Sequence, residues 1–126
     1  MTKYLHKDLT AKIIKYFYNV FDELGYGFLE SVYESALVLE LNNMGLKVER
    51  QKELGVFYKG VSIGKYRSDI IVEDKVIIEL KAISQLIKAH KVQLVNYLKA
   101  TNIEIGLLVN FGEKINFKRK IFRNKN

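Results

Sequence analysis

The sequence predicts a mixed α/β fold of the α+β kind, with a mixed central sheet flanked by helices. Residues 8–44 carry apolar side chains at helical spacing, whereas the pattern after residue 46 alternates or runs apolar as in strands. A further helical pattern then separates two apolar strands. A hairpin followed by a helix that crosses over to another strand implies a mixed sheet with helices packed on it.

Two helices are expected at the start of the chain. Apolar residues recur at helical spacing over 8–24, and Gly25 is the expected stop. A second helix is expected over about 29–44, and Gly45 would end it.

The rest of the chain alternates between strand and helix patterns, and Lys59-Gly60 is expected to form a turn between two strands. The order is α-α-β-β-β-α-β-β. The expected elements are strands over 47–58, 62–72 and 76–82, a helix over 87–99, a strand over 104–110 and an edge strand over 116–121.

The length of 126 residues predicts a single domain over 1–126. No apolar run is long enough to span a bilayer and no leader pattern is present, so no membrane partner is expected and a cytoplasmic location is the default. Because cysteine is absent, any metal site must use oxygen or histidine ligands.

The formal net charge is +7, which fits a polyanionic partner such as nucleic acid, although a solvated basic surface is the plainer explanation. The basic residues gather toward the C-terminus, as Lys114, Lys118, Arg119, Lys120, Arg123 and Lys125.

Three charged residues, Asp69, Glu79 and Lys81, lie in runs that otherwise read as strand, where charge is costly unless it is paired or bound. If 73–75 form a three-residue loop, Asp69 lies directly opposite Glu79, with Cβ atoms about 5 Å apart. Lys81 then shares their face. A two-residue loop would instead turn Asp69 to the other face.

Two carboxylates this close repel each other, and a divalent cation removes that cost. Mg²⁺ prefers a small number of carboxylates and polarises a phosphoryl oxygen, while Lys81 could stabilise developing negative charge. The alternative is a cross-strand salt bridge from Lys81 to Asp69 or Glu79 on a half-solvated sheet.

Further motifs accompany this cluster in order along nearly the whole chain, and the set resembles the GxxExxY family, a small branch of the PD-(D/E)XK nuclease superfamily. The motifs are Gly27-Phe-Leu-Glu30-Ser-Val-Tyr33, Glu49-Arg-Gln51, Tyr58-Lys-Gly60, Tyr66-Arg-Ser-Asp69, Glu79-Leu-Lys81, His90-Lys-Val-Gln93, Asn96-Tyr97-Leu98-Lys99-Ala100-Thr101 and Gly106-Leu-Leu-Val-Asn110-Phe-Gly112.

The resemblance implies a restriction-endonuclease-like αβββαβ core with a Mg²⁺ or Mn²⁺ site at the edge of the central hairpin. It implies that Asp69, Glu79 and the backbone carbonyl of Leu80 are metal ligands and that Lys81 is the catalytic lysine. Glu30 matches an acidic residue that binds the metal directly or through water, although a glutamate at a helix start also favours the helix dipole.

Gln93 and Tyr97 resemble a Gln-x-x-x-Tyr element on the helix after the lysine strand. Their spacing puts both on one side of that helix, where they could touch substrate or the catalytic lysine, or simply form an amphipathic pattern. Ser68 stands where the superfamily name has proline, and many members lack that proline. Tyr33 is expected in the core, with its hydroxyl bonded to a partner near the site, and Gly27 is expected at a helix entry.

The expected function is a Mg²⁺-dependent nuclease that hydrolyses phosphodiester bonds in nucleic acid, with DNA preferred over RNA. A homodimer or another partner is expected to supply specificity, because the chain is barely larger than a catalytic core. Two rivals remain open. One is a non-catalytic nucleic-acid-binding or protein-interaction module on the nuclease fold, and the other is a structural protein whose charged cluster is a salt-bridge network.

Overall fold

The computed structural model describes residues 6–123, and these form three helices and seven strands. The helices are α1 (Lys7–Leu24), α2 (Glu30–Asn43) and α3 (Lys88–Ala100). The strands are β1 (Val48–Arg50), β2 (Glu53–Tyr58), β3 (Val61–Arg67), β4 (Ile70–Val72), β5 (Val76–Lys81), β6 (Ile105–Phe111) and β7 (Ile115–Ile121). The three predicted helices and the predicted edge strand over 116–121 are confirmed. Lys125, the last residue of the basic C-terminal run, lies outside the described residues.

The main sheet has five strands in the order β1-β4-β5-β6-β7. Strands β5 and β6 run parallel, joined by α3, and the other neighbours run antiparallel. This confirms the predicted mixed sheet, and it leaves β5 in the middle, covered on both faces.

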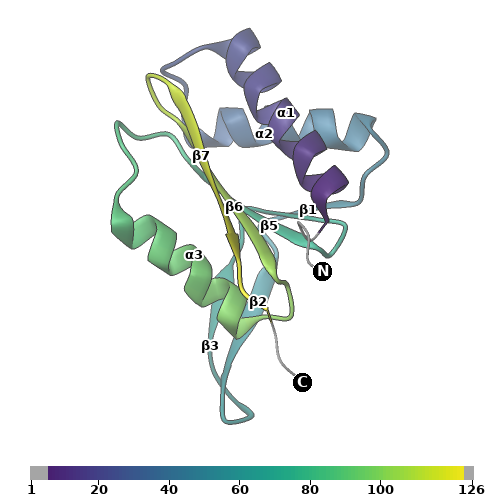
Figure 1. The fold of residues 1–126 in the computed structure, drawn as a ribbon, viewed down its shortest axis with the longest axis vertical. Coiled ribbons are helices and arrows are strands. Elements are labelled where there is room, and N and C mark those ends of the chain that lie inside the picture. Colours follow the sequence, from purple (N-terminus) through teal and green to yellow (C-terminus); the bar gives the residue numbers. More distant parts are fainter. Residues whose placement is uncertain (1–5, 124–126) are drawn as a thin grey trace.

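Helices lie on both faces of the sheet (Figure 1). On one face, α1 and α2 bury Phe17, Tyr33 and Leu37 against strand residues such as Ile78. On the other face, α3 packs Leu94 and Leu98 on a second, smaller cluster, which includes Ile71, Ile77 and Leu108. Successive residues of β5 therefore point to different cores, as expected for a central strand.

Two of the predicted strands are wrong, because each is interrupted in the structure. The run over 47–58 breaks at Gln51, which has a positive φ of 49°, and the run over 62–72 breaks at Ser68. Backbone hydrogen bonds tie the two breaks together, from Gln51 N to Asp69 O at 2.9 Å and from Ser68 N to Lys52 O at 3.0 Å. The chain leaves the main sheet at this bend.

Beyond the bend, β2 and β3 form a separate two-stranded sheet that projects from the body of the molecule (Figure 1). The expected turn at Lys59-Gly60 closes it, with positive φ at both residues, as a tight hairpin turn requires. The hairpin returns the chain to the main sheet just before Asp69.

The predicted register of β4 and β5 is confirmed. Val72 pairs with Val76 and Ile70 with Ile78, so residues 73–75 form the three-residue loop. Glu73 and Asp74 adopt positive φ there. Within residues 6–123, every helix is too short or too polar to cross a bilayer.

Candidate active site

The candidate site lies where β4 begins and β5 ends. Continuing the observed register by one pair places Asp69 opposite Glu79, on the face of the sheet that α3 covers. The Asp69 carboxylate accepts a hydrogen bond from the backbone N–H of Leu80 at 2.7 Å, where β4 no longer offers a strand partner. Lys81 shares the face of Glu79 as the last residue of β5.

The electrostatics of this pair are unfavourable when both groups are ionised. Burial, and then the charge of Asp69, raise the pKa of the Glu79 carboxyl from 4.5 to about 8. The Tyr66 hydroxyl and the Lys81 ammonium favour the ionised form but do not outweigh these effects. The pair is thus an uncompensated acidic site, and a bound cation would relieve the repulsion.

Tyr66, at the end of β3, is a site residue that the sequence reasoning missed. Its hydroxyl donates a hydrogen bond to Glu79 Oε2 at 2.8 Å, and its ring stacks on that of Tyr97 from α3, with centroids 3.5 Å apart. Burial raises the pKa of the Tyr66 hydroxyl, and the carboxylate of Glu79 adds to the rise. Tyr66 therefore links the acidic pair to α3.

The predicted Gln93 and Tyr97 element does lie together on one flank of α3. Burial raises the pKa of Tyr97, the charges of Glu79 and Asp69 add to it, and a side-chain hydrogen bond with Gln93 opposes it. Tyr97 thus faces the acidic pair through Tyr66, and Gln93 supports Tyr97.

Glu30 is placed differently from the other predicted ligands. It is the exposed first residue of α2, whereas the acidic side chain of α2 that is buried is Glu34, one turn later and 7% exposed. In residues 6–123 no three His, Cys, Asp or Glu side chains form a group that could hold a metal ion. The structure thus brings Asp69 and Glu79 together without Glu30.

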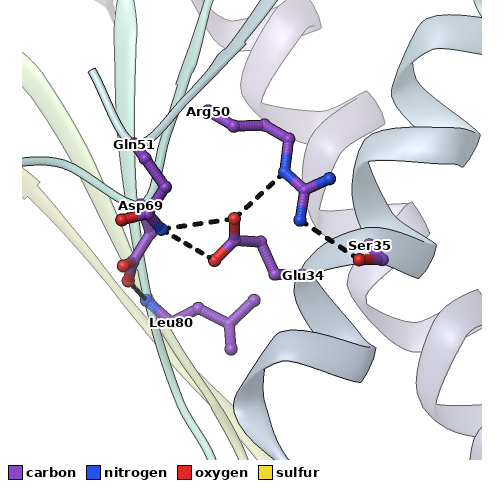
Figure 2. Close-up of polar contacts among 6 residues, drawn as sticks. All are labelled: Glu34, Ser35, Arg50, Gln51, Asp69 and Leu80. Carbon is purple, nitrogen blue, oxygen red and sulfur yellow. Dashed lines mark hydrogen bonds and ion pairs between the residues drawn. The ribbon is translucent and has the colours of Figure 1, made fainter.

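Glu34 is the centre of a polar layer beside Asp69 (Figure 2). Its carboxylate accepts hydrogen bonds from Arg50 Nε at 3.1 Å and from Gln51 Nε2 at 3.1 and 3.3 Å. Because the backbone N–H of Gln51 also bonds to the carbonyl of Asp69, this layer fixes the bend from which Asp69 projects.

The Gly27–Tyr33 motif has a structural role. Tyr33 is fully buried, as predicted, and stacks on Phe111 with centroids 4.5 Å apart. Its hydroxyl donates to the carbonyl of Gly25 and accepts from the N–H of Phe28, so it holds the loop into α2 rather than reaching the acidic pair. Gly27 has a φ of 111°, which confirms the expected unusual backbone.

Asn110 fixes the chain that follows Lys81. It lies beside Lys81 in the parallel register and is 3% exposed. Its side-chain amide accepts from the N–H of Ile83 and donates to the carbonyl of Ile83, at 3.0 and 2.9 Å. The segment after Lys81 is therefore anchored to β6 although it is not a strand.

These observations define a restriction-endonuclease-like α+β chain with two opposed carboxylates and an adjacent lysine. The family model of the PD-(D/E)XK nuclease superfamily matches residues 7–123, and the chain therefore belongs to that superfamily. Its nucleases generally depend on divalent metal ions and act on nucleic acid.

Among solved structures, the chain is similar to that described as "Crystal structure of SSO0001", with a TM-score of 0.58 and 23% sequence identity. The similarity covers 75% of this chain and 50% of the other, so the chain matches about half the length of that protein. At this identity the likeness concerns the fold alone. The comparison with curated proteins found no match.

Proposed function

We propose that this protein is a metal-dependent nuclease that hydrolyses phosphodiester bonds in nucleic acid, with DNA as the preferred substrate. The observation that carries the proposal is the opposition of Asp69 and Glu79 at the end of a central strand, one residue pair beyond Ile70 and Ile78, with Lys81 beside them. Membership of the nuclease superfamily supports the same reaction.

The residues present fit a Mg²⁺ or Mn²⁺ ion. Asp69 and Glu79 supply two carboxylates, and burial followed by the charge of Asp69 raises the pKa of Glu79 to about 8. In an antiparallel pair, the N–H and C=O of one residue point to the same neighbour. The carbonyl of Leu80 is thus directed to the side where its N–H meets Asp69. A bound ion supplies electrophilic polarisation of the phosphodiester.

Lys81 is the proposed catalytic residue. Its position beside Glu79 lets its ammonium group hold an attacking water or stabilise the charge that develops on phosphate oxygens. Gln93 and Tyr97 act as supporting residues, because Tyr97 stacks on the tyrosine that hydrogen-bonds to Glu79. For Glu30, exposed at the start of α2, we propose contact with the metal only through water.

We further infer that the chain belongs to the GxxExxY branch of the superfamily. Two residues of that motif have structural roles, since Gly27 adopts a positive φ and Tyr33 fixes the loop that contains Gly27.

The rival function is a nucleic-acid-binding module without catalysis. One observation favours it, because no third acidic or histidine side chain joins Asp69 and Glu79 within residues 6–123. The opposition of two half-buried carboxyl groups argues against it, since a binding module gains nothing from their repulsion.

The test is cleavage of single-stranded and duplex DNA and of RNA, with Mg²⁺, Mn²⁺ or EDTA. We expect cleavage by the wild type with a divalent ion and none by Lys81→Ala, while Lys75→Ala, which removes an exposed lysine of the β4–β5 turn, cleaves normally. Nucleic-acid binding without cleavage under any of these conditions would support the rival module.

A further inference from the structure

A lysine-lined groove runs between α3 and β7, on the flank of α3 that faces away from Tyr66. Its first part is a hollow of about 370 Å³. Four lysines line it together with the apolar side chains of Val92 and Val95, and none of the residues within 6–123 that line it carries a carboxylate. The four lysines are Lys88, Lys91, Lys99 and Lys120.

The second part of the groove is a hollow of about 500 Å³ that shares Lys91 with the first. It adds Lys114 and Lys118, and among the described residues that line it Glu113 alone is acidic. Asn110 also lines it and is the residue of β6 that pairs with Lys81. The second hollow therefore reaches the residue that neighbours Lys81 in the sheet.

The fold itself gathers these lysines. On β7, Lys118 lies opposite Leu108, and Lys120 lies opposite Gly106. Leu108 packs in the cluster beneath α3, so the two lysines lie on the face that α3 covers. On α3, the successive positions of Lys88, Lys91 and Lys99 differ by three residues or by a multiple of four. The three lysines therefore lie along one side of the helix.

Like charges that lie close together in a hollow repel one another unless solvent or a polyanion compensates them. We propose that the α3–β7 groove binds the sugar-phosphate backbone of a nucleic-acid strand and leads that strand to the candidate active site. The lysines contact phosphates, and Val92, which is 48% exposed, packs against a sugar. This inference rests on the proposed function for its choice of polyanion.

The test measures binding rather than cleavage, in EDTA, by fluorescence anisotropy of labelled single-stranded DNA, duplex DNA and RNA over a series of salt concentrations. The groove variant combines Lys88→Ala, Lys91→Ala, Lys99→Ala and Lys120→Ala. The control variant removes the same charge at exposed lysines that line neither hollow, by Lys12→Ala, Lys15→Ala, Lys59→Ala and Lys75→Ala.

We expect the groove variant to bind at least about tenfold more weakly than the control. For single-stranded nucleic acid, the slope of the logarithm of the binding constant against the logarithm of the salt concentration should fall in magnitude by roughly 0.7 for each lost phosphate contact. Surface substitutions usually shift the thermal unfolding midpoint by only a few degrees. Shifts on that order in both variants would show that they fold. The polymer that loses most affinity identifies whether DNA or RNA occupies the groove.

Equal losses in the two variants would overturn the proposal, because net charge alone would then explain binding. Absence of nucleic-acid binding by the wild type would also overturn it. Selective loss in the groove variant, in a protein that cleaves nothing with any metal, would support the groove and reject the nuclease. The two proposals can therefore fail separately.

Discussion

At the scale of single residues, Tyr66 connects the acidic pair to the rest of the molecule. Its hydroxyl donates to Glu79 at 2.8 Å, so it orients the carboxylate that we propose as a metal ligand. Residues that orient ligands typically contribute 10–100-fold, as an order of magnitude, to metal affinity or activity. We expect Tyr66→Phe to lower cleavage at limiting Mg²⁺ by roughly that factor.

The matched control is Tyr58→Phe, which removes a hydroxyl from an exposed position of the same hairpin. Cleavage measured over a range of Mg²⁺ concentrations separates a weaker metal site from a general loss of activity. If Tyr66→Phe cleaves as well as Tyr58→Phe at low Mg²⁺, Tyr66 does not orient the ligand.

The acidic pair also predicts how stability depends on pH. The pKa of Glu79 rises from 4.5 to about 8 on folding, so the folded protein keeps a proton that the unfolded chain has released. Stability in EDTA should therefore be greatest below pH 4.5 for this group and fall as pH rises toward 8. The measurement is the urea midpoint at several pH values.

In Glu79→Gln this pH dependence should be smaller than in the wild type, because the group that titrates is gone. Glu23→Gln, at an exposed position of α1, should keep the wild-type dependence. Added Mg²⁺ should restore stability at pH 8 in the wild type but not in Glu79→Gln. Parallel pH curves for the two variants would contradict this account.

The sequence allowed part of this site to be predicted. Counting the loop residues placed Asp69 opposite Glu79, and the observed pairs agree. Tyr66 could not be found in the same way, because strict alternation along one strand would put Tyr66 and Asp69 on different faces. The bend at Ser68 changes that relation, and it depends on long-range backbone hydrogen bonds.

At the scale of elements, the packing of α3 on β6 positions both Tyr97 and the lysine-lined groove. Gly106 makes this contact possible, since a Cβ at that position would lie 2.6 Å from Leu94 Cδ1 and 2.9 Å from its Cγ. Leu94 is buried, so it has little room to move. We expect Gly106→Ala to lower the free energy of unfolding by about 1–3 kcal/mol.

Urea denaturation provides the measurement for Gly106→Ala, and Gly64→Ala is the control. Gly64 also lies in a strand, but a Cβ there would meet nothing within 4 Å. A Gly106→Ala protein as stable as Gly64→Ala would show that α3 does not pack closely on β6.

The helices were predictable as elements because apolar spacing marks them, and Gly25 ends α1 where expected. The long strands over 47–58 and 62–72 were not, because strand patterns do not show that a chain changes sheets. Gln51 adopts a positive φ although it is not glycine, so its residue type does not mark the break.

At the scale of the whole molecule, the candidate site is assembled from distant parts of the chain. Asp69 comes from the bend before β4, Glu79 from β5, Tyr66 from the projecting hairpin and Tyr97 from α3. Glu34 of α2 supports the bend that carries Asp69 (Figure 2). Loop counting linked Asp69 to Glu79 in advance and the family resemblance added Tyr97, whereas no local pattern relates Tyr66 or Glu34 to the pair.

The central claim is that Asp69 and Glu79 form a metal centre for phosphodiester cleavage, and Asp69→Asn tests it most directly. An asparagine oxygen can still accept the hydrogen bond from Leu80 N–H, so the change removes charge with little change of shape. The control is Asp74→Asn. Asp74 lies in the β4–β5 turn, and its exposed carboxylate forms an ion pair with Lys47.

The decisive measurement is Mg²⁺-dependent cleavage of DNA by the wild type, Asp69→Asn and Asp74→Asn, with Mg²⁺ binding followed by titration calorimetry. The account predicts that Asp69→Asn loses Mg²⁺ binding and that its cleavage falls by more than the roughly 100-fold seen for outer-shell residues, whereas Asp74→Asn retains both. Wild-type Mg²⁺ affinity and cleavage in Asp69→Asn would contradict it.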